Sequence, residues 1–228
     1  MASSFVSSPV ELCCKGVLFD MDGILISSLG SVERSWTKWA QLRGVDPEDA
    51  IHIVHGRRAI DMLIALRPDL DGEEELRILE DFEVEDTGGL VVLPGVCDLI
   101  DSLGGDRWTV VTSATERLAR IRMAAGGIPV PPKLVTAEAV KAGKPDPAPY
   151  LAGAALLGFD PRQCVVFEDA ASGVAAGRAA GCTVIATTFS HAPESLQAAH
   201  YLIRDLTGVQ VDHLPELDSL RLRFTPLS

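Results

Sequence analysis

The sequence predicts an α/β fold, in which helices cover both faces of a central parallel sheet and a further helical segment is inserted after the first strand. Short apolar runs that do not alternate with polar residues recur along the chain, and helical stretches separate them. Such runs are typical of parallel strands that are buried on both faces. One long stretch near the start shows helical spacing alone. Together these three observations favour a three-layer α/β core with a helical insertion.

Three apolar runs end at polar residues, as buried strands do where they reach a turn. The first covers residues 16–19 and stops at Asp20, the second covers 108–111, and the third covers 164–167. Further strands are expected at 183–186 and 201–203, a very short one at 134–135, and helices at 115–125 and 171–180. These elements make up the expected sheet and its helices, while the tail from residue 211 onward shows no clear pattern.

The stretch between Ile26 and Leu93 is expected to be wholly helical, because no strand-like run appears there and apolar residues recur at helical spacing. Trp36 and Trp39 follow this spacing, which indicates packing and not a platform for stacking bases. Glycine and proline residues divide the stretch into about four helices. We therefore predict a core formed by 1–26 and 93–228, with a helical domain inserted at 27–92.

Composition and charge exclude several classes of protein. Of the 228 residues, 47% are hydrophobic and 23% are charged, as in folded globular domains and not in disordered chains. The formal net charge of -12 leaves no overall field that would attract nucleic acid or an anionic membrane. The five cysteines include no C-x-x-C pair, and no signal-peptide pattern or long apolar run is present. We expect a cytoplasmic protein with a small-molecule partner and no zinc or disulfide framework. Its oligomeric state stays open, and a monomer is compatible with the sequence.

Polar side chains follow three of the predicted strands, at the edge where parallel sheets bind ligands. They are Asp20 and Asp22 after the first strand, Thr112 after the second, and Glu168 and Asp169 after the third. Carboxylates gathered on one edge repel each other unless a cation lies among them, and an oxygen-only set suits Mg²⁺ better than zinc or copper. The set predicts a magnesium site, although each acidic pair by itself is equally consistent with an ordinary turn.

Two further features suit a phosphate ligand. Lys144 lies in a Gly-Lys-Pro loop stiff enough to hold its ammonium as a fixed charge, and the alternative is a solvated loop lysine. Thr112 and the amide of Ser113 lie at a strand-to-helix turn, where hydroxyl and N–H groups bind phosphate oxygens. The alternative for Thr112 is a helix N-cap.

Four motifs, in this order, resemble those of the haloacid dehalogenase superfamily. They are Asp20-Met21-Asp22-Gly23, the strand-end Thr112, Gly143-Lys144-Pro145 and Glu168-Asp169-Ala170-Ala171-Ser172-Gly173. The resemblance spans nearly the whole chain and implies a Rossmann-like core with an inserted α-helical cap, as in the sugar-phosphatase and β-phosphoglucomutase branch. In that branch cap and core close over the substrate, so the insertion is expected to be the cap.

The resemblance implies a role for each motif residue. Asp20 would be the nucleophile that forms an aspartyl-phosphate, and Asp22 the acid/base that protonates the leaving group and then activates water. Thr112 and Lys144 would bind the transferring phosphoryl group. The implied ligands of Mg²⁺ are Asp20, the carbonyl of Asp22, Asp169 and, directly or through water, Glu168.

Three positions bear on the reaction that the resemblance implies. Dehalogenases of the superfamily lack the second Asp of the first motif, so Asp22 favours phosphoryl transfer. Mutases carry a His early in the first cap helix, where Val32 stands here, so the expected reaction is hydrolysis of a small sugar or polyol phosphate. A β-phosphoglucomutase-like phosphomutase stays an alternative. So does a catalytically weak phosphosugar-binding protein, because Ser27 replaces the hinge Asp of many members.

The cap loop at 52–58 is similar to the His-Gly loop of phosphatases that act on glycerol phosphate and 2-deoxyglucose 6-phosphate. This similarity implies that the loop faces the core and selects the substrate. His55 and Arg57 are expected to contact substrate hydroxyls or phosphate, while Gly56 lets the backbone approach closely. The alternative is that Arg57 and Arg58 lie at a solvated helix start.

Overall fold

The computed structural model describes residues 8–52 and 57–227, and at its centre lies a parallel sheet with the strand order β5-β2-β6-β7-β8. The strands are β2 Gly16–Phe19, β5 Trp108–Val110, β6 Cys164–Glu168, β7 Thr183–Thr187 and β8 Tyr201–Ile203. The predicted parallel sheet is confirmed at these positions. The expected strand at 134–135 is wrong, because Val135 makes only a single bridge to Val111 before the chain turns into a 3₁₀ helix, η1 (Ala137–Ala139).

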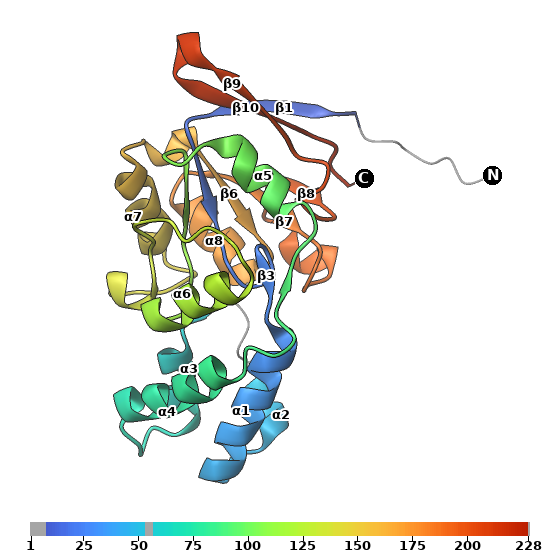
Figure 1. The fold of residues 1–228 in the computed structure, drawn as a ribbon. Coiled ribbons are helices and arrows are strands. Elements are labelled where there is room, and N and C mark those ends of the chain that lie inside the picture. The colour runs from blue at the N-terminus through green and yellow to red at the C-terminus, as the bar shows by residue number, and fades with distance from the viewer. Residues whose placement is uncertain (1–7, 53–56, 228) are drawn as a thin grey trace, which may run out of the picture.

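Strand side chains alternate between two apolar cores, one on each face of the sheet. The helices that cover the faces are α5 Val96–Leu103 and α6 Glu116–Ala125 on one side, and α7 Ala148–Leu157 and α8 Ala171–Ala179 on the other (Figure 1). In β2, Val17 and Phe19 join the core with α5 and α6, whereas Leu18 joins the core with α7 and α8. Because both faces are buried, the apolar runs of the sequence do not alternate.

In the described residues, the insertion forms four helices, which lie beyond the carboxyl edge of the sheet (Figure 1). They are α1 Leu29–Arg43, α2 Pro47–His52, α3 Ala59–Leu66 and α4 Gly72–Glu85. Trp36 and Trp39 are buried with Leu79 in a core of the insertion's own, so their expected packing role is confirmed. The expectation of a wholly helical stretch is wrong at its ends, where the two-residue strands β3 (Ile26–Ser27) and β4 (Val91–Val92) pair antiparallel. Strands this short leave no periodic signal.

A second, antiparallel sheet covers the end of the molecule opposite the insertion (Figure 1). It has the order β1-β10-β9, with β1 Val10–Cys14, β9 Gln210–Leu214 and β10 Ser219–Phe224. In β10, Leu220, Leu222 and Phe224 are buried and alternate with more exposed polar residues. This alternation is the pattern of a half-buried strand, so the sequence of the tail does contain a strand signal.

Local capping explains where the helices begin and end. Gly44 ends α1 in the left-handed region, with φ of 66°, which glycine adopts without strain. Asp71 begins α4 by accepting the backbone N–H groups of Glu73 and Glu74. The other 3₁₀ helices are η2 Pro161–Gln163, η3 Pro193–Leu196 and η4 Pro215–Leu217. Within the two described ranges, none of the helices combines the length and apolar character that a membrane span requires.

Candidate functional site

The carboxyl edge of the parallel sheet brings together residues that are far apart in the sequence. Asp20 follows β2, and its N–H donates to the carbonyl of Phe167 at 3.0 Å. Thr112 follows β5, and its N–H donates to the carbonyl of Val135 at 2.9 Å. Glu168 is the last residue of β6. Because β5, β2 and β6 are neighbours in a parallel sheet, these strand ends share one edge.

Lys144 is buried between two carboxylates and is not the solvated loop lysine of the alternative interpretation. Its Nζ donates to Asp20 Oδ1 and to Glu168 Oε1, each at 2.7 Å, and its side chain is 1% exposed. Burial acts to lower the pKa of this ammonium, but the two carboxylates outweigh burial and hold the pKa above its usual value. Lys144 therefore stays charged and holds Asp20 in place.

Both carboxylate oxygens of Glu168 are engaged by protein donors. Besides Lys144, Oε1 accepts the hydroxyl of Tyr150 at 2.7 Å. The other oxygen, Oε2, accepts the backbone N–H groups of Asp169 at 2.9 Å and Ala170 at 3.0 Å. Burial acts to raise the pKa of Glu168, yet Lys144 and these hydrogen bonds hold it below its usual value. Glu168 is thus a fixed anion that orients the lysine.

Asp20, Glu168 and Asp169 form a buried carboxylate set that suits a hard cation. One oxygen of each lies within 4.8 Å of the others. Burial, with repulsion from Glu168, raises the pKa of Asp20 to about 7 and that of Asp169 well above its usual value. Two glycines leave room for these carboxylates. A Cβ at Gly23 would lie 1.9 Å from Asp169 Oδ2, and a Cβ at Gly173 would lie 1.6 Å from Glu168 Oε1. The oxygen donors, their burial and their excess negative charge fit a divalent cation such as Mg²⁺.

A cavity of about 110 Å³ lies between the sheet edge and the helical insertion. Its core wall includes Asp20, Asp22, Thr112, Ser113 and Asp169. Its insertion wall includes Trp36, Arg57, Leu76, Glu80 and Glu83. Lys144 does not line the cavity, but it is hydrogen-bonded to Asp20, which does. The structure therefore brings most of the residues singled out in the sequence to the wall of one cavity.

The turn after β5 places Thr112 and Ser113 in the cavity wall. Thr112 Oγ1 accepts the N–H of Ala114 at 3.1 Å. Helix α6 is capped by Thr115, whose Oγ1 accepts the N–H of Leu118 at 3.3 Å. The alternative role of Thr112 as the helix N-cap is therefore wrong, because the helix begins later in the chain.

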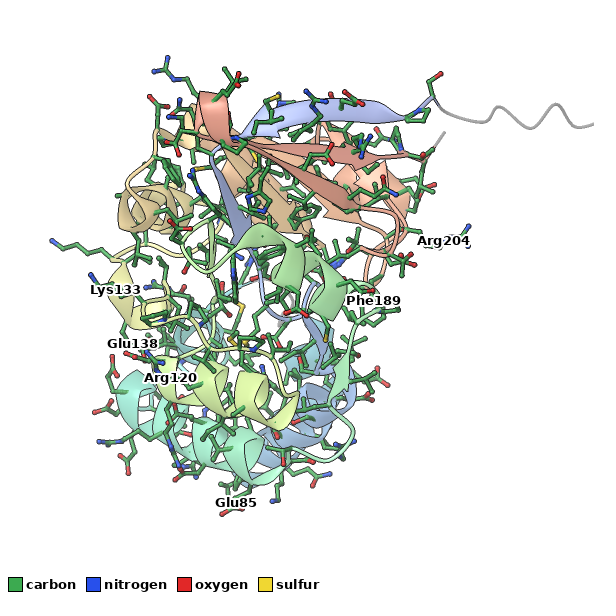
Figure 2. All side chains as sticks on the ribbon, turned by 45° about the horizontal axis from the view of Figure 1, so that its top comes forward. Glu85, Arg120, Lys133, Glu138, Phe189 and Arg204 are labelled. Atoms are coloured by element: carbon green, nitrogen blue, oxygen red, sulfur yellow. The ribbon has the colours of Figure 1, made fainter. Side chains whose placement is uncertain are left out.

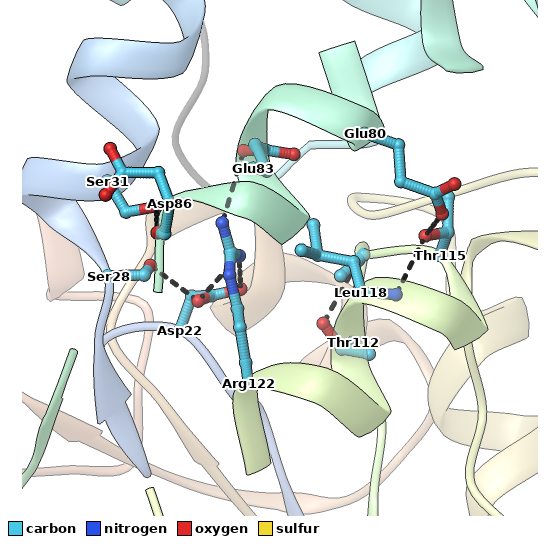
Figure 3. Close-up of polar contacts among 11 residues, drawn as sticks. Asp22, Ser28, Ser31, Glu80, Glu83, Asp86, Thr112, Thr115, Leu118 and Arg122 are labelled. Atoms are coloured by element: carbon cyan, nitrogen blue, oxygen red, sulfur yellow. Dashed lines mark hydrogen bonds and ion pairs between the residues drawn. The ribbon is translucent and has the colours of Figure 1, made fainter. Parts of the chain in front are cut away.

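Asp22 lies in a chain of polar contacts that crosses from the core to the insertion (Figure 3). Both of its carboxylate oxygens accept Arg122 Nη1 at 3.0 Å, and Ser28 donates to Oδ1 at 2.6 Å. Arg122 Nη2 donates in turn to Glu83 of α4 at 3.2 Å. Burial raises the pKa of Glu83 to about 7, and Arg122 opposes this rise. Asp22 is thus tied to the insertion through one guanidinium.

Sequence reasoning missed Arg122 and Glu83. Arg122 lies on the buried stripe of α6 together with Leu118 and Met123. Glu83 lies on the buried stripe of α4, four residues after Leu79. A charged residue at a core-facing helical position is the signal that could have found both, since such residues are rarely buried without a partner.

The predicted cap-loop residues fall partly outside the structure's described range. His55 and Gly56 lie outside the described residues, so their roles stay predictions. Arg57 is exposed and lines the cavity. Arg58 pairs with Asp61 at 2.9 Å and donates to two carbonyl groups of the core loop that follows η1. Both arginines line the cavity, but the guanidinium of Arg58 is hydrogen-bonded to protein partners, whereas the side chain of Arg57 is exposed.

The sequence and the fold of this chain are similar to those of known proteins. Residues 14–181 match the family model described as haloacid dehalogenase-like hydrolase. The chain is 42% identical over 210 residues to hexitol phosphatase A of Escherichia coli strain K12, with 90% of this chain and 97% of that protein covered. It is 34% identical over 233 residues to glycerol-1-phosphate phosphohydrolase 1 of Saccharomyces cerevisiae, with 96% and 93% covered.

Among solved structures, β-phosphoglucomutase from Clostridium difficile has a similar fold. The TM-score is 0.72 at 20% identity, and the match covers 85% of this chain and 92% of that chain. At this identity the likeness concerns the fold alone.

Proposed function

Because this chain belongs to the haloacid dehalogenase-like hydrolase family, we propose that it is a phosphatase that releases inorganic phosphate from a small sugar or polyol phosphate. The observation that carries the proposal is that Asp20, which lines the cavity, is paired with the buried Lys144 at 2.7 Å. A carboxylate held by a fixed cation suits attack on phosphorus. The relatives named as hexitol and glycerol-1-phosphate phosphatases support the same substrate class.

The reaction proceeds in two steps. Asp20 attacks the phosphorus of the bound ester, and the bond between phosphorus and the ester oxygen breaks while an aspartyl-phosphate forms. Asp22 gives its proton to the departing oxygen, which leaves as an alcohol. Asp22 then takes a proton from a water molecule that attacks phosphorus; the bond between phosphorus and the Asp20 oxygen breaks, so that phosphate is released and the Asp20 carboxylate is restored. Both carboxylates line one cavity, which supports this division of labour.

The transferring phosphoryl group is bound by groups at the sheet edge. The hydroxyl of Thr112 and the amide of Ser113 donate to its oxygens from the turn after β5. Lys144 adds a positive charge next to Asp20, where negative charge gathers during the transfer. Thr112 and Lys144 are preorganised, because each is held by hydrogen bonds of the core.

Mg²⁺ is the cofactor that the carboxylate set fits. Asp20, Asp169 and the carbonyl of Asp22 would hold it, and when bound it lowers the repulsion between the nucleophile and the phosphate. Glu168 is assigned to Lys144 and not to the cation, because four hydrogen-bond donors already occupy its two oxygens. Glu168 therefore supports the site by orienting Lys144.

Hydrolysis is favoured over phosphate transfer between two positions of a sugar. Val32 lines the cavity at the position where the resemblance places a histidine in the mutases. An apolar side chain can neither form the hydrogen bonds of a histidine nor exchange a proton, so this feature of the mutases is missing here.

The substrate class is tested by measuring phosphate release from a panel of esters. We expect a hexitol phosphate and glycerol 1-phosphate to release phosphate with Mg²⁺ present, and release to stop when the metal is chelated. The panel includes a hexose 1-phosphate, whose conversion to the 6-isomer without phosphate release would establish a mutase. Binding of these esters without any release would contradict the proposed phosphatase.

Mg²⁺ is expected to raise the melting temperature more at pH 8 than at pH 6. The pKa of Asp20 is about 7 without a cation, so below that pH the metal must displace a proton. This displacement costs about 1.4 kcal/mol per pH unit below the pKa. The raised pKa also means that Asp20 favours folding at low pH, and that this contribution is lost as the pH rises through about 7. Thermal unfolding with and without Mg²⁺ measures the difference.

A pair of Asp→Asn variants controls this prediction. Asp169→Asn removes a carboxylate of the buried set and should abolish the Mg²⁺-dependent shift. Asp106→Asn changes a side chain that is 89% exposed and should leave it intact. Equal shifts at both pH values, or an unchanged shift in Asp169→Asn, would show that the cation binds elsewhere.

A further inference from the structure

We propose that Arg122 is a positioning residue for the acid/base Asp22, and that Glu83 of the helical insertion completes its placement, so that docking of α4 sets the geometry of proton transfer. This inference rests on the proposed phosphatase function. It adds to that function a residue of the core and a residue of the insertion that touch neither the nucleophile nor its lysine.

The contacts of Arg122 make it a bridge and not a surface cation. Its side chain is 3% exposed. Arg122 Nη1 donates to both carboxylate oxygens of Asp22 at 3.0 Å, and Nη2 donates to Glu83 at 3.2 Å. A buried cation is stable only when carboxylates compensate it, so Arg122 is confined between these two partners. Figure 3 shows the three side chains in line from the core loop to α4.

Asp22 itself is held on two sides. Arg122 fixes the plane of the carboxylate, and Ser28 donates to Oδ1 from the connection to α1. General acid catalysis needs the proton-bearing oxygen within hydrogen-bond reach of the leaving oxygen, so orientation controls the rate. When Asp22 passes its proton to the departing ester oxygen, an alcohol leaves and Asp22 becomes an anion, which Arg122 stabilises by charge. The same anion then accepts the proton of water.

The insertion takes part because α4 is tied to α6 at more than one point. Near the end of α4, Glu83 accepts a hydrogen bond from Arg122. One turn earlier, Glu80 accepts a hydrogen bond from the hydroxyl of Thr115. Arg117 of α6 also donates to Glu80 at 2.8 Å. These contacts fix α4 over α6, so the position of Arg122 depends on how the insertion docks on the core.

The test compares two esters that differ in their need for a general acid. The leaving group of a hexitol phosphate is a strongly basic alkoxide that needs a proton, whereas the leaving group of p-nitrophenyl phosphate is weakly basic and does not. The ratio kcat/KM reports only the steps up to loss of the leaving group, so the later attack of water does not enter it. For Arg122→Lys we expect kcat/KM to fall about tenfold to a hundredfold for the hexitol phosphate, and about twofold or less for p-nitrophenyl phosphate.

Two further variants make the test specific. Glu83→Gln keeps an oxygen that can accept from Arg122 but removes the charge, and should show the same selective loss at a smaller size. Arg120→Lys is the matched control, since Arg120 is on the same helix, pairs with Glu116 and has a side chain that is 41% exposed (Figure 2). It should leave both esters unchanged.

The outcomes separate the inference from the function beneath it. An equal fall of kcat/KM on both esters in Arg122→Lys and Glu83→Gln would show a merely structural role and overturn the inference. If kcat/KM for the hexitol phosphate were unchanged in both variants, the inference would be overturned as well. If Arg122→Lys does not fold, Glu83→Gln decides alone. A wild-type protein that cleaves neither ester would contradict the proposed phosphatase itself.

Discussion

Replacing Asp20 by asparagine is expected to lower kcat by a factor of about 10⁴ or more, because removal of the group that bonds to the substrate eliminates the covalent route. Asparagine has nearly the same shape, and its Oδ1 can still accept Lys144 Nζ. The fold should therefore persist, and the loss should appear in kcat rather than in thermal stability. Steady-state phosphate release with Mg²⁺ and a hexitol phosphate measures it.

Trapping the intermediate gives the same variant a second readout. After rapid acid quench with radiolabelled substrate, wild-type protein should carry acid-stable, base-labile label, and Asp20→Asn should carry none. Asp106→Asn, an exposed position, should retain both label and activity. Label on Asp20→Asn, or turnover within about tenfold of wild type, would assign the nucleophile to another residue.

Replacing Lys144 by methionine is expected to lower both stability and activity. Asp20 and Glu168 would then be buried side by side without the cation that now separates them at 2.7 Å from each. Removing one partner of a buried ionic network costs about 3–5 kcal/mol of folding free energy. Loss of a positive charge at the transferring phosphoryl group should lower kcat/KM by a factor of about 10²–10³.

The stability loss of Lys144→Met should depend on pH. Lys144 lowers the pKa of Asp20, so without it that pKa rises further above its unfolded value. A raised carboxyl pKa favours the folded state at low pH and destabilises it as the pH rises, so the loss should be larger at pH 8 than at pH 6. Urea unfolding in the presence of a chelator measures it at both pH values.

Lys141→Met is the matched control, because Lys141 is an exposed lysine of the same loop. It should change neither the stability nor kcat/KM. If Lys144→Met were as stable and as active as Lys141→Met, the buried network would have no role in folding or catalysis.

Much of the parallel core could be predicted from the sequence because its signal is local. The strand that ends at Phe19 is a short apolar run bounded by a turn, and each of the other core strands has the same form. The pairing of β3 with β4 could not be predicted, since two residues carry no period. The antiparallel strand Ser219–Phe224 could have been predicted, because buried apolar and more exposed residues alternate along it.

The candidate site also contains residues with a local sequence signal and residues without one. Asp20, Thr112 and Glu168 are recognisable in the sequence because each directly follows, or ends, a buried strand, and parallel strands share one functional edge. The sequence allows two roles for Lys144, a phosphate ligand or a solvated lysine, because nothing local distinguishes a buried lysine from an exposed one. Its burial depends on segments 124 positions apart in the chain.

The sequence by itself determined the class of fold, the carboxylates at the strand ends and the family, since these depend on short runs and on motif order. Only the tertiary structure decided which partner each carboxylate receives. In the folded chain Asp20 pairs with Lys144. Asp22 pairs with Arg122, which lies 100 positions away in the sequence and also contacts Glu83. The reason is that charge pairing depends on distance and burial in space, and both are set by the order of the strands and by how the insertion docks on the core.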